Sequence, residues 1–222
     1  MLPLVPLGKK GSTGIPIFTI FISVVCIIVY AFASQEADQL ALAFYPDQLD
    51  PLKMLTSVFT HGSLWHLAVN LFFFYSFSRT IETQLTATGY LLAFVVFVLI
   101  TNLSFALTSN GDIPTIGLSG VVWGYMGMFL FRYGKDDITC WFIRSIEVPA
   151  FLFILAFLAF DIAAFRHGGN VHVNYAAHFS GFIVGALYKL AFWKIFTTEN
   201  PPGPKKRPVL GPSRAPARLP RR

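Results

Sequence analysis

A serine in the segment Gly117-Leu118-Ser119-Gly120 opens a long apolar run and could act as a nucleophile. Glycines beside it leave room for a substrate backbone or a second helix to come close. A serine hydroxyl attacks a carbonyl when a base accepts its proton, and histidine can supply that base. Small residues also line ordinary contacts between membrane helices, so this segment alone leaves catalysis and packing open.

A candidate base, His178, lies near the start of a later apolar run. His66 and Asn70 open another run, and they share a helix face because they are four residues apart. The Asn70 amide, the His66 imidazole and the Ser119 backbone N–H could stabilise the oxyanion of acyl transfer. Each of these residues also has a structural alternative. His178 could bond to a neighbouring carbonyl, and His66 and Asn70 could form hydrogen bonds that hold helices together.

The composition predicts a membrane protein. Of 222 residues, 55% are hydrophobic and 13% are charged, and the charges leave long runs free. Soluble domains carry roughly 25% charged residues. Seven basic residues lie in residues 205–222, where Pro and Gly abound, which predicts a disordered cytoplasmic tail and not a nucleic-acid site. Cys26 and Cys140 predict neither a disulfide nor a metal site.

The apolar runs predict an all-α membrane protein, a bundle of six transmembrane helices. A span needs about 20 apolar residues. The fourth run is short, so we expect Ser119 in a depression below the membrane surface. The expected organisation is a cytoplasmic segment (1–14), a membrane domain (15–197) and the tail (198–222). The six expected spans are residues 15–33, 64–81, 90–107, 117–131, 148–165 and 175–196.

The basic residues predict the orientation of the bundle. With six spans, most of them fall on one side, which should be the cytoplasm, and only Lys53 and Arg166 fall on the other. Both termini are then cytoplasmic. The second, fourth and sixth spans all begin at the outer side. His66, Asn70, Ser119 and His178 are therefore expected in one layer near the outer surface.

Two stripes of small residues predict close contact between the fourth and sixth spans. Gly120, Gly124 and Gly127 share one helix face, and Gly181 and Gly185 share another. If the stripes meet, His178 comes within reach of Ser119. The stripes could instead face other helices.

These motifs together resemble the rhomboid family of intramembrane serine proteases, in its basic six-span bacterial form. His61-Gly-Ser-Leu-Trp-His66-Leu-Ala-Val-Asn70 resembles the second-span motif, and Gly117-Leu118-Ser119-Gly120 resembles the nucleophile motif. Ala177-His178 followed by Gly181 and Gly185 resembles the sixth-span motif. The resemblance covers about residues 15–196.

The resemblance implies an endopeptidase that cuts membrane-anchored proteins within or next to their transmembrane segments. Ser119 would be the nucleophile and His178 the base, a dyad without an acid, with His66, Asn70 and the Ser119 N–H binding the oxyanion. The resemblance implies no cofactor and no metal. It also implies a multi-pass protein of a bacterial inner membrane, whose substrates enter between the second and fifth spans. Supporting residues would be His61, Gly117, Gly120, Trp123, Gly181 and Gly185, and Glu82 would be structural.

The sequence departs from the family at two places, and one further acid is notable. Trp123 stands where the family has a tyrosine that stacks on the base, and residues 34–60 lack a Trp-Arg pair, so that loop should sit differently. Asp161, in the outer half of the fifth span, could orient His178. Because the family does without an acid, we expect Asp161 to face water or line the gate.

Two alternative functions can be distinguished from the protease by features of the sequence. A zinc-dependent membrane hydrolase would use several histidines, but His61 and His66 would lie about 140° apart around a helix, and no His-Glu-x-x-His motif occurs. A non-catalytic rhomboid-like protein would bind membrane segments without cutting them. Such a protein would lack the serine or the histidine, and this chain has both.

Overall fold

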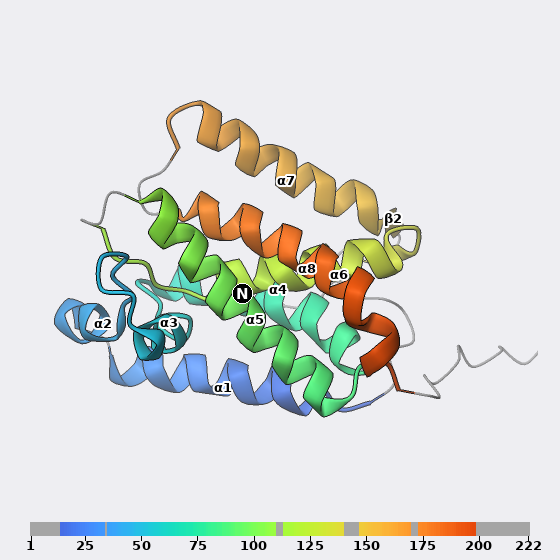
Figure 1. The fold of residues 1–222 in the computed structure, drawn as a ribbon, viewed down its shortest axis with the longest axis horizontal. Coiled ribbons are helices and arrows are strands. Elements are labelled where there is room, and N and C mark those ends of the chain that lie inside the picture. The colour runs from blue at the N-terminus through green and yellow to red at the C-terminus, as the bar shows by residue number, and fades with distance from the viewer. Residues whose placement is uncertain (1–13, 34, 110–112, 140–146, 170–172, 199–222) are drawn as a thin grey trace, which may run out of the picture.

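A computed structural model describes residues 14–33, 35–109, 113–139, 147–169 and 173–198. The expected tail, most of the expected N-terminal segment and Cys140 lie outside the described residues. The described residues form eight helices and one antiparallel pair of strands, arranged as a helical bundle (Figure 1). In chain order they are α1 (Ile17–Phe32), α2 (Glu36–Leu42), α3 (Pro51–Ser57), α4 (Leu64–Glu82), α5 (Ala87–Thr108), α6 (Ser119–Tyr133), β1 (Asp137–Thr139), β2 (Glu147–Pro149), α7 (Ala150–Arg166) and α8 (Tyr175–Phe196).

Each of the six expected spans coincides with one helix to within three residues at either end, and the expected bounds of the sixth match α8 at both ends. Two helices, α5 and α8, are long and apolar enough to cross a membrane, with mean hydropathy of 2.4 and 1.3 over their most apolar windows. The apolar helix α1 is shorter. The all-helical fold is therefore confirmed, whereas the count of six spans stays a prediction. The sequence did not predict α2, α3 or the strand pair.

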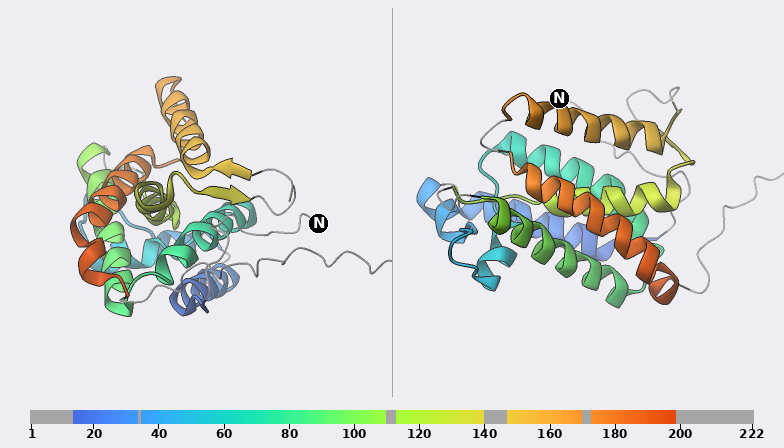
Figure 2. Two further views of the ribbon diagram at one scale, coloured as in Figure 1. Left: turned by 90° about the vertical axis from the view of Figure 1, so that its right-hand side faces the viewer. Right: turned by 45° about the horizontal axis from the view of Figure 1, so that its top comes forward.

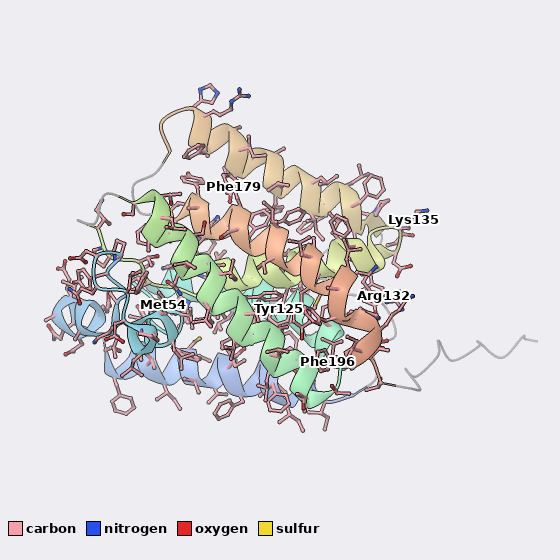
Figure 3. All side chains as sticks on the ribbon, viewed as in Figure 1. Met54, Tyr125, Arg132, Lys135, Phe179 and Phe196 are labelled. Carbon is pink, nitrogen blue, oxygen red and sulfur yellow. The ribbon has the colours of Figure 1, made fainter. Side chains whose placement is uncertain are left out.

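Helix α6 runs through the centre of the bundle. Eleven of its residues are buried, and α4, α5 and α8 pack around it. Tyr125 lies at the middle of the molecule (Figure 3), and its ring stacks on Tyr90 with centroids 5.3 Å apart. The Tyr90 hydroxyl lies 2.6 Å from Ser78 Oγ and 3.2 Å from Thr19 Oγ1, so this core is tied by polar contacts between three helices.

The end of α4 holds the start of α1 through Glu82. Its carboxylate accepts from the backbone N–H groups of Phe18 and Thr19, both at 2.8 Å, and from the Thr19 hydroxyl at 2.6 Å. Pro16, the residue before α1, makes no side-chain cap. A carboxylate at a helix N-terminus satisfies free N–H groups and complements the helix dipole. These contacts fit the structural role expected for Glu82.

Helices α6 and α8 touch through their backbones. A methyl group added at Gly181 would overlap the carbonyl oxygen of Gly120, and one at Gly185 would overlap that of Gly124. The prediction that Gly181 and Gly185 face the fourth span is confirmed. The stripe on α6 is shared between neighbours: methyl groups at Gly120 and Gly124 would instead meet side chains of α5, and of the three only Gly127 would direct a methyl group at α8.

Helix α7 forms a separate layer at one side of the bundle (Figure 1), and it projects above the strand pair when viewed along the bundle (Figure 2, left). Only Ala150 and Ile154, both near its start, are buried. Ring contacts join α7 to α4, with Phe157 5.1 Å from Phe73. Helix α7 is therefore held less extensively than the other long helices.

The bundle has two chemically different ends. Helices α6 and α8 start at the same end, near α2 and α3 (Figure 1). Arg132 and Lys135 lie at the opposite end from Met54 of α3 (Figure 3). Basic residues also stand in the last turns of α4 and α8, at Arg79 and Lys194. This distribution agrees with the side that the sequence assigns to the cytoplasm.

Candidate active site

Ser119 and His178 meet where α6 and α8 begin. Ser119 is the first residue of α6, and His178 lies in the first turn of α8. His178 Nε2 is 2.9 Å from Ser119 Oγ. This distance is within the hydrogen-bond reach that a nucleophile and its base require. The glycine contact between α6 and α8 begins one residue after Ser119 and sets this approach.

The carboxylate of Asp161 on α7 contacts the other nitrogen of the same imidazole. Asp161 Oδ2 lies 2.5 Å from His178 Nδ1, and the two side chains are 14% and 12% exposed. The expectation that Asp161 faces water is wrong, whereas a place at the gate stays a prediction. An acid within an apolar helix is usually paired, so the sequence indicates that Asp161 has a partner but not which one.

The indole of Trp123 packs beside the imidazole. Trp123 lies one turn after Ser119 on α6, and its ring centroid is 5.7 Å from that of His178, with the planes 34° apart. Tyr175 approaches the imidazole edge-on at 6.3 Å. The base is thus flanked by two aromatic rings, with the indole tilted and not parallel to the imidazole.

Both side-chain candidates for the oxyanion site lie near Gly117, two residues before Ser119. A methyl group at Gly117 would lie 2.8 Å from His66 Nε2 and 3.9 Å from Asn70 Nδ2. Asn70 Nδ2 donates to the His66 carbonyl at 2.9 Å. An amide carries two N–H groups, so Asn70 can donate one more hydrogen bond. The Ser119 N–H stands at the start of α6, where Leu118 provides no side-chain cap, and such N–H groups lack intrahelical partners.

His61 lies against His66, with ring centroids 5.1 Å apart in an edge-to-face arrangement. The expectation that the two rings diverge around one helix is wrong, because α4 begins at Leu64, capped by Ser63, and His61 precedes it. His61 Nδ1 contacts the Phe59 carbonyl at 3.2 Å, and its buried Nε2 has no hydrogen-bond partner in the described structure. Burial, with the neighbouring His66, lowers the pKa of His61 to about 3, so its ring is neutral at ordinary pH.

Within the described part of the chain, no three His, Cys, Asp or Glu side chains gather where they could hold a metal ion. His172 lies outside the described residues, so this finding does not cover it. Metal independence therefore stays a prediction.

The loop before Ser119 is fixed by backbone hydrogen bonds to two other segments. Thr115 pairs with Phe44 through two backbone bonds of 2.9 and 3.1 Å, and Gly117 N donates to the Ser57 carbonyl at 2.8 Å. Gly117 adopts a φ of +111°, a conformation that side-chain-bearing residues avoid. Residues far apart in sequence thus hold the nucleophile's loop in place.

Asn174 joins this loop to α8, and sequence reasoning missed it. Its Oδ1 accepts from Ala177 N at 2.9 Å, which caps α8, and its Nδ2 donates to Thr115 Oγ1 at 3.0 Å. An asparagine directly before an apolar run is an N-cap signal that could have indicated the first contact. One residue therefore links the loop of the nucleophile to the helix of the base.

A small polar cavity lies beside Ser119. Its volume is about 10 Å³, close to the space of one water molecule. Peptide hydrolysis consumes water, so a polar space next to the hydroxyl suits that chemistry. Its polar side chains are those of Ser57, Thr101, Asn102, Thr115, Ser119 and Asn174.

Comparison with known proteins identifies the family of the chain. The family described as Rhomboid domain matches residues 48–195, more than half of the chain. Rhomboid protease GlpG of Salmonella paratyphi A is 29% identical over 175 residues, which are 75% of this chain and 60% of that protein. GlpG of Pectobacterium atrosepticum is 28% identical over 196 residues, covering 87% and 66%. Rhomboid protein 1, mitochondrial, of Saccharomyces cerevisiae is 27% identical over 144 residues, covering 62% and 40%.

The chain thus spans less than two thirds of the length of these relatives. The match of the family across residues 48–195 nevertheless takes in His66, Asn70, Ser119, Asp161 and His178. The chain belongs to the rhomboid family of integral membrane proteins.

Proposed function

We propose that the protein is an intramembrane serine endopeptidase that cleaves membrane-anchored proteins within or next to their transmembrane segments. The observation that carries this proposal is the 2.9 Å contact between His178 Nε2 and Ser119 Oγ at the start of two helices. The names of two relatives, which call them rhomboid proteases, support the same reaction.

Catalysis follows from the placement of these groups. Ser119 Oγ attacks the carbonyl carbon of the scissile peptide, and its proton passes to His178 Nε2. The carbonyl oxygen becomes an oxyanion, stabilised by the His66 imidazole, the Asn70 amide and the Ser119 N–H. His178 then gives its proton to the leaving amine. Water hydrolyses the acyl-enzyme with His178 again as the base.

The membrane placement is part of the proposal. Six spans would put both termini in the cytoplasm of a bacterial cell, with the protein in its inner membrane. The basic residues Arg79, Arg132 and Lys194 in the last turns of α4, α6 and α8 support this orientation. By resemblance to the family, the substrate helix enters between α4 and α7. Side-chain ring contacts such as Phe73–Phe157 join these helices and can part without breaking hydrogen bonds.

The test uses the purified full-length protein, reconstituted in lipid with a single-span substrate. The wild type should cut the substrate and react with a serine-directed fluorophosphonate, and Ser119→Ala should do neither. Ser180→Ala is the matched control, because Ser180 lies two residues after His178 and, among the described residues, its hydroxyl bonds only to its own helix, at Ala177 O. Undiminished cleavage by well-folded Ser119→Ala would contradict the proposal.

A further inference from the structure

We propose that Asp161 is a positioning residue for the base, so that this chain carries an Asp161–His178–Ser119 triad in place of a dyad. Asp161 would hold His178 in the tautomer that bears its proton on Nδ1. The inference rests on the proposed function, because it assigns a role in the same reaction.

The geometry gives each imidazole nitrogen a single partner. Nδ1 is 2.5 Å from Asp161 Oδ2, and Nε2 is 2.9 Å from Ser119 Oγ. An ionised carboxylate only accepts hydrogen bonds, so Nδ1 must donate to it. Nε2 then presents its lone pair to the serine hydroxyl, which is the state that a general base needs. Without the carboxylate, the two neutral tautomers compete, and one of them cannot accept the proton.

The position of Asp161 on its helix points to the same role. It is the sole acidic residue of α7, whose other residues are apolar except for Arg166 at the end. Burying a carboxylate in a membrane helix is costly, so such residues are paired and tend to be functional. Here the partner is the base itself. At this end of α7 the neighbouring contacts are apolar: the Phe165 ring lies 5.7 Å from Tyr175 and 6.1 Å from Phe179, which projects between α8 and α7 (Figure 3).

The proton count is complete without Asp161 changing its charge. As the Ser119 Oγ–carbon bond forms, the carbonyl π pair moves to oxygen and the Oγ proton moves to His178 Nε2. The imidazole becomes an imidazolium, whose positive charge lies against the carboxylate. Asp161 stays ionised throughout and stabilises that charge, as the acid does in other serine triads.

If Asp161 served only to tether α7 to α8, its variants would rank differently in activity. Asparagine has the size of aspartate and keeps a polar contact, so for a tether Asp161→Asn should be more active than Asp161→Ala. For a positioning role the order reverses, because the Asn amide can donate to Nδ1 and place the proton on Nε2. We expect kcat to fall by about 10²- to 10⁴-fold in Asp161→Asn, the upper figure being that of such a change in a known triad. The loss in Asp161→Ala should be no larger, and KM should change little in both.

The experiment measures kcat and KM for the reconstituted full-length wild type, Asp161→Asn, Asp161→Ala and the control Ile162→Ala. Ile162 is the next residue on α7 and is 42% exposed. In parallel, ¹⁵N-histidine NMR reads the tautomer of His178, with its signals identified by their loss in His178→Ala. We expect a proton on Nδ1 in the wild type and on Nε2 in Asp161→Asn, with Ile162→Ala behaving as wild type.

Three results would overturn the positioning role: wild-type kcat in Asp161→Asn, higher activity in Asp161→Asn than in Asp161→Ala, or a wild-type His178 with its proton on Nε2. The NMR signal does not depend on proteolysis. If Ser119→Ala still cleaves, the protease proposal fails by itself, whereas the tautomer still decides whether Asp161 orients the imidazole.

Discussion

His178 Nε2 lies 2.9 Å from Ser119 Oγ although the two residues are 59 positions apart in the chain. Each stands at or near the start of its helix, and the two helices approach until the backbone at Gly181 meets the carbonyl of Gly120. The hydrogen bond therefore depends on the contact between α6 and α8 just below it.

Ser119 and His178 should behave as one unit. Ser119→Ala and His178→Ala should each remove nearly all cleavage, and the double variant should cost little more, because covalent catalysis is lost at the first change. Single-turnover cleavage of a reconstituted substrate measures all three. Full activity in His178→Ala with none in Ser119→Ala would remove His178 as the base.

Asn70 should contribute part of the oxyanion stabilisation. Asn70→Ala should lower kcat by about 10²-fold, the usual loss for one oxyanion donor, since His66 and the Ser119 N–H remain. KM should change little, because the lost hydrogen bond forms in the transition state. Wild-type kcat would show that Asn70 serves only its 2.9 Å bond to the His66 carbonyl.

Gly181 should tolerate no larger side chain. Gly181→Leu should force α8 from α6, because even a methyl group would overlap Gly120 O, and activity should be lost even if the protein still inserts. The control Ala191→Leu adds similar bulk on an exposed face of α8 and should keep activity. Fluorophosphonate labelling compares the two, and normal labelling of Gly181→Leu would contradict the close contact.

The reaction should not need a metal. Cleavage should survive strong chelators, and the purified protein should hold no stoichiometric zinc by elemental analysis. The rings of His61 and His66 lie together, so these two are the residues to examine if chelation matters. Activity that is lost on chelation and restored by zinc would favour a zinc-dependent hydrolase.

Both termini should face the cytoplasm. A reporter that is active only outside the cytoplasm, fused after Arg222, should stay silent in bacteria, because the basic residues hold that side inside. The same reporter placed after Gly168, in the loop between α7 and α8, should be active. A signal from the first fusion would mean that the six-span count or the orientation is wrong.

Sequence patterns predicted the long helices well because each is a long apolar run, and α8 has the expected bounds, Tyr175 and Phe196. The layer that holds Ser119 and His178 followed from the direction of the spans alone. The short helices α2 and α3 were not predicted, because seven residues of mixed polarity are too few to show a helical periodicity. The sequence does carry the signal that separates His61 from the helix of His66, because Ser63 is an N-cap residue and α4 begins directly after it.

The contact of Asp161 with His178 could not be read from the pattern of α7. That helix is apolar on all sides, so periodicity does not say which face meets the bundle. Its rotation is set by tertiary contacts, such as Phe157 against Phe73 and Phe165 against Tyr175. The family resemblance pointed away from an acid, and only the three-dimensional arrangement brings the carboxylate to the base.

Because α7 forms a separate layer, the contact of His178 with Asp161 and its contact with Ser119 should change differently with bilayer thickness. Helix α7 has 17 residues and α8 has 22, lengths of about 26 and 33 Å at about 1.5 Å per residue. Hydrophobic mismatch tilts helices, and α6 and α8 must tilt together because their backbones are in contact. Helix α7 is held by backbone bonds at its start, where Phe151 N donates to Gly134 O at 3.0 Å, and by side-chain contacts along the rest of its described length, so its far end can tilt alone. We therefore expect a thicker bilayer to lengthen the Asp161–His178 contact first, while Ser119 and His178 stay in register.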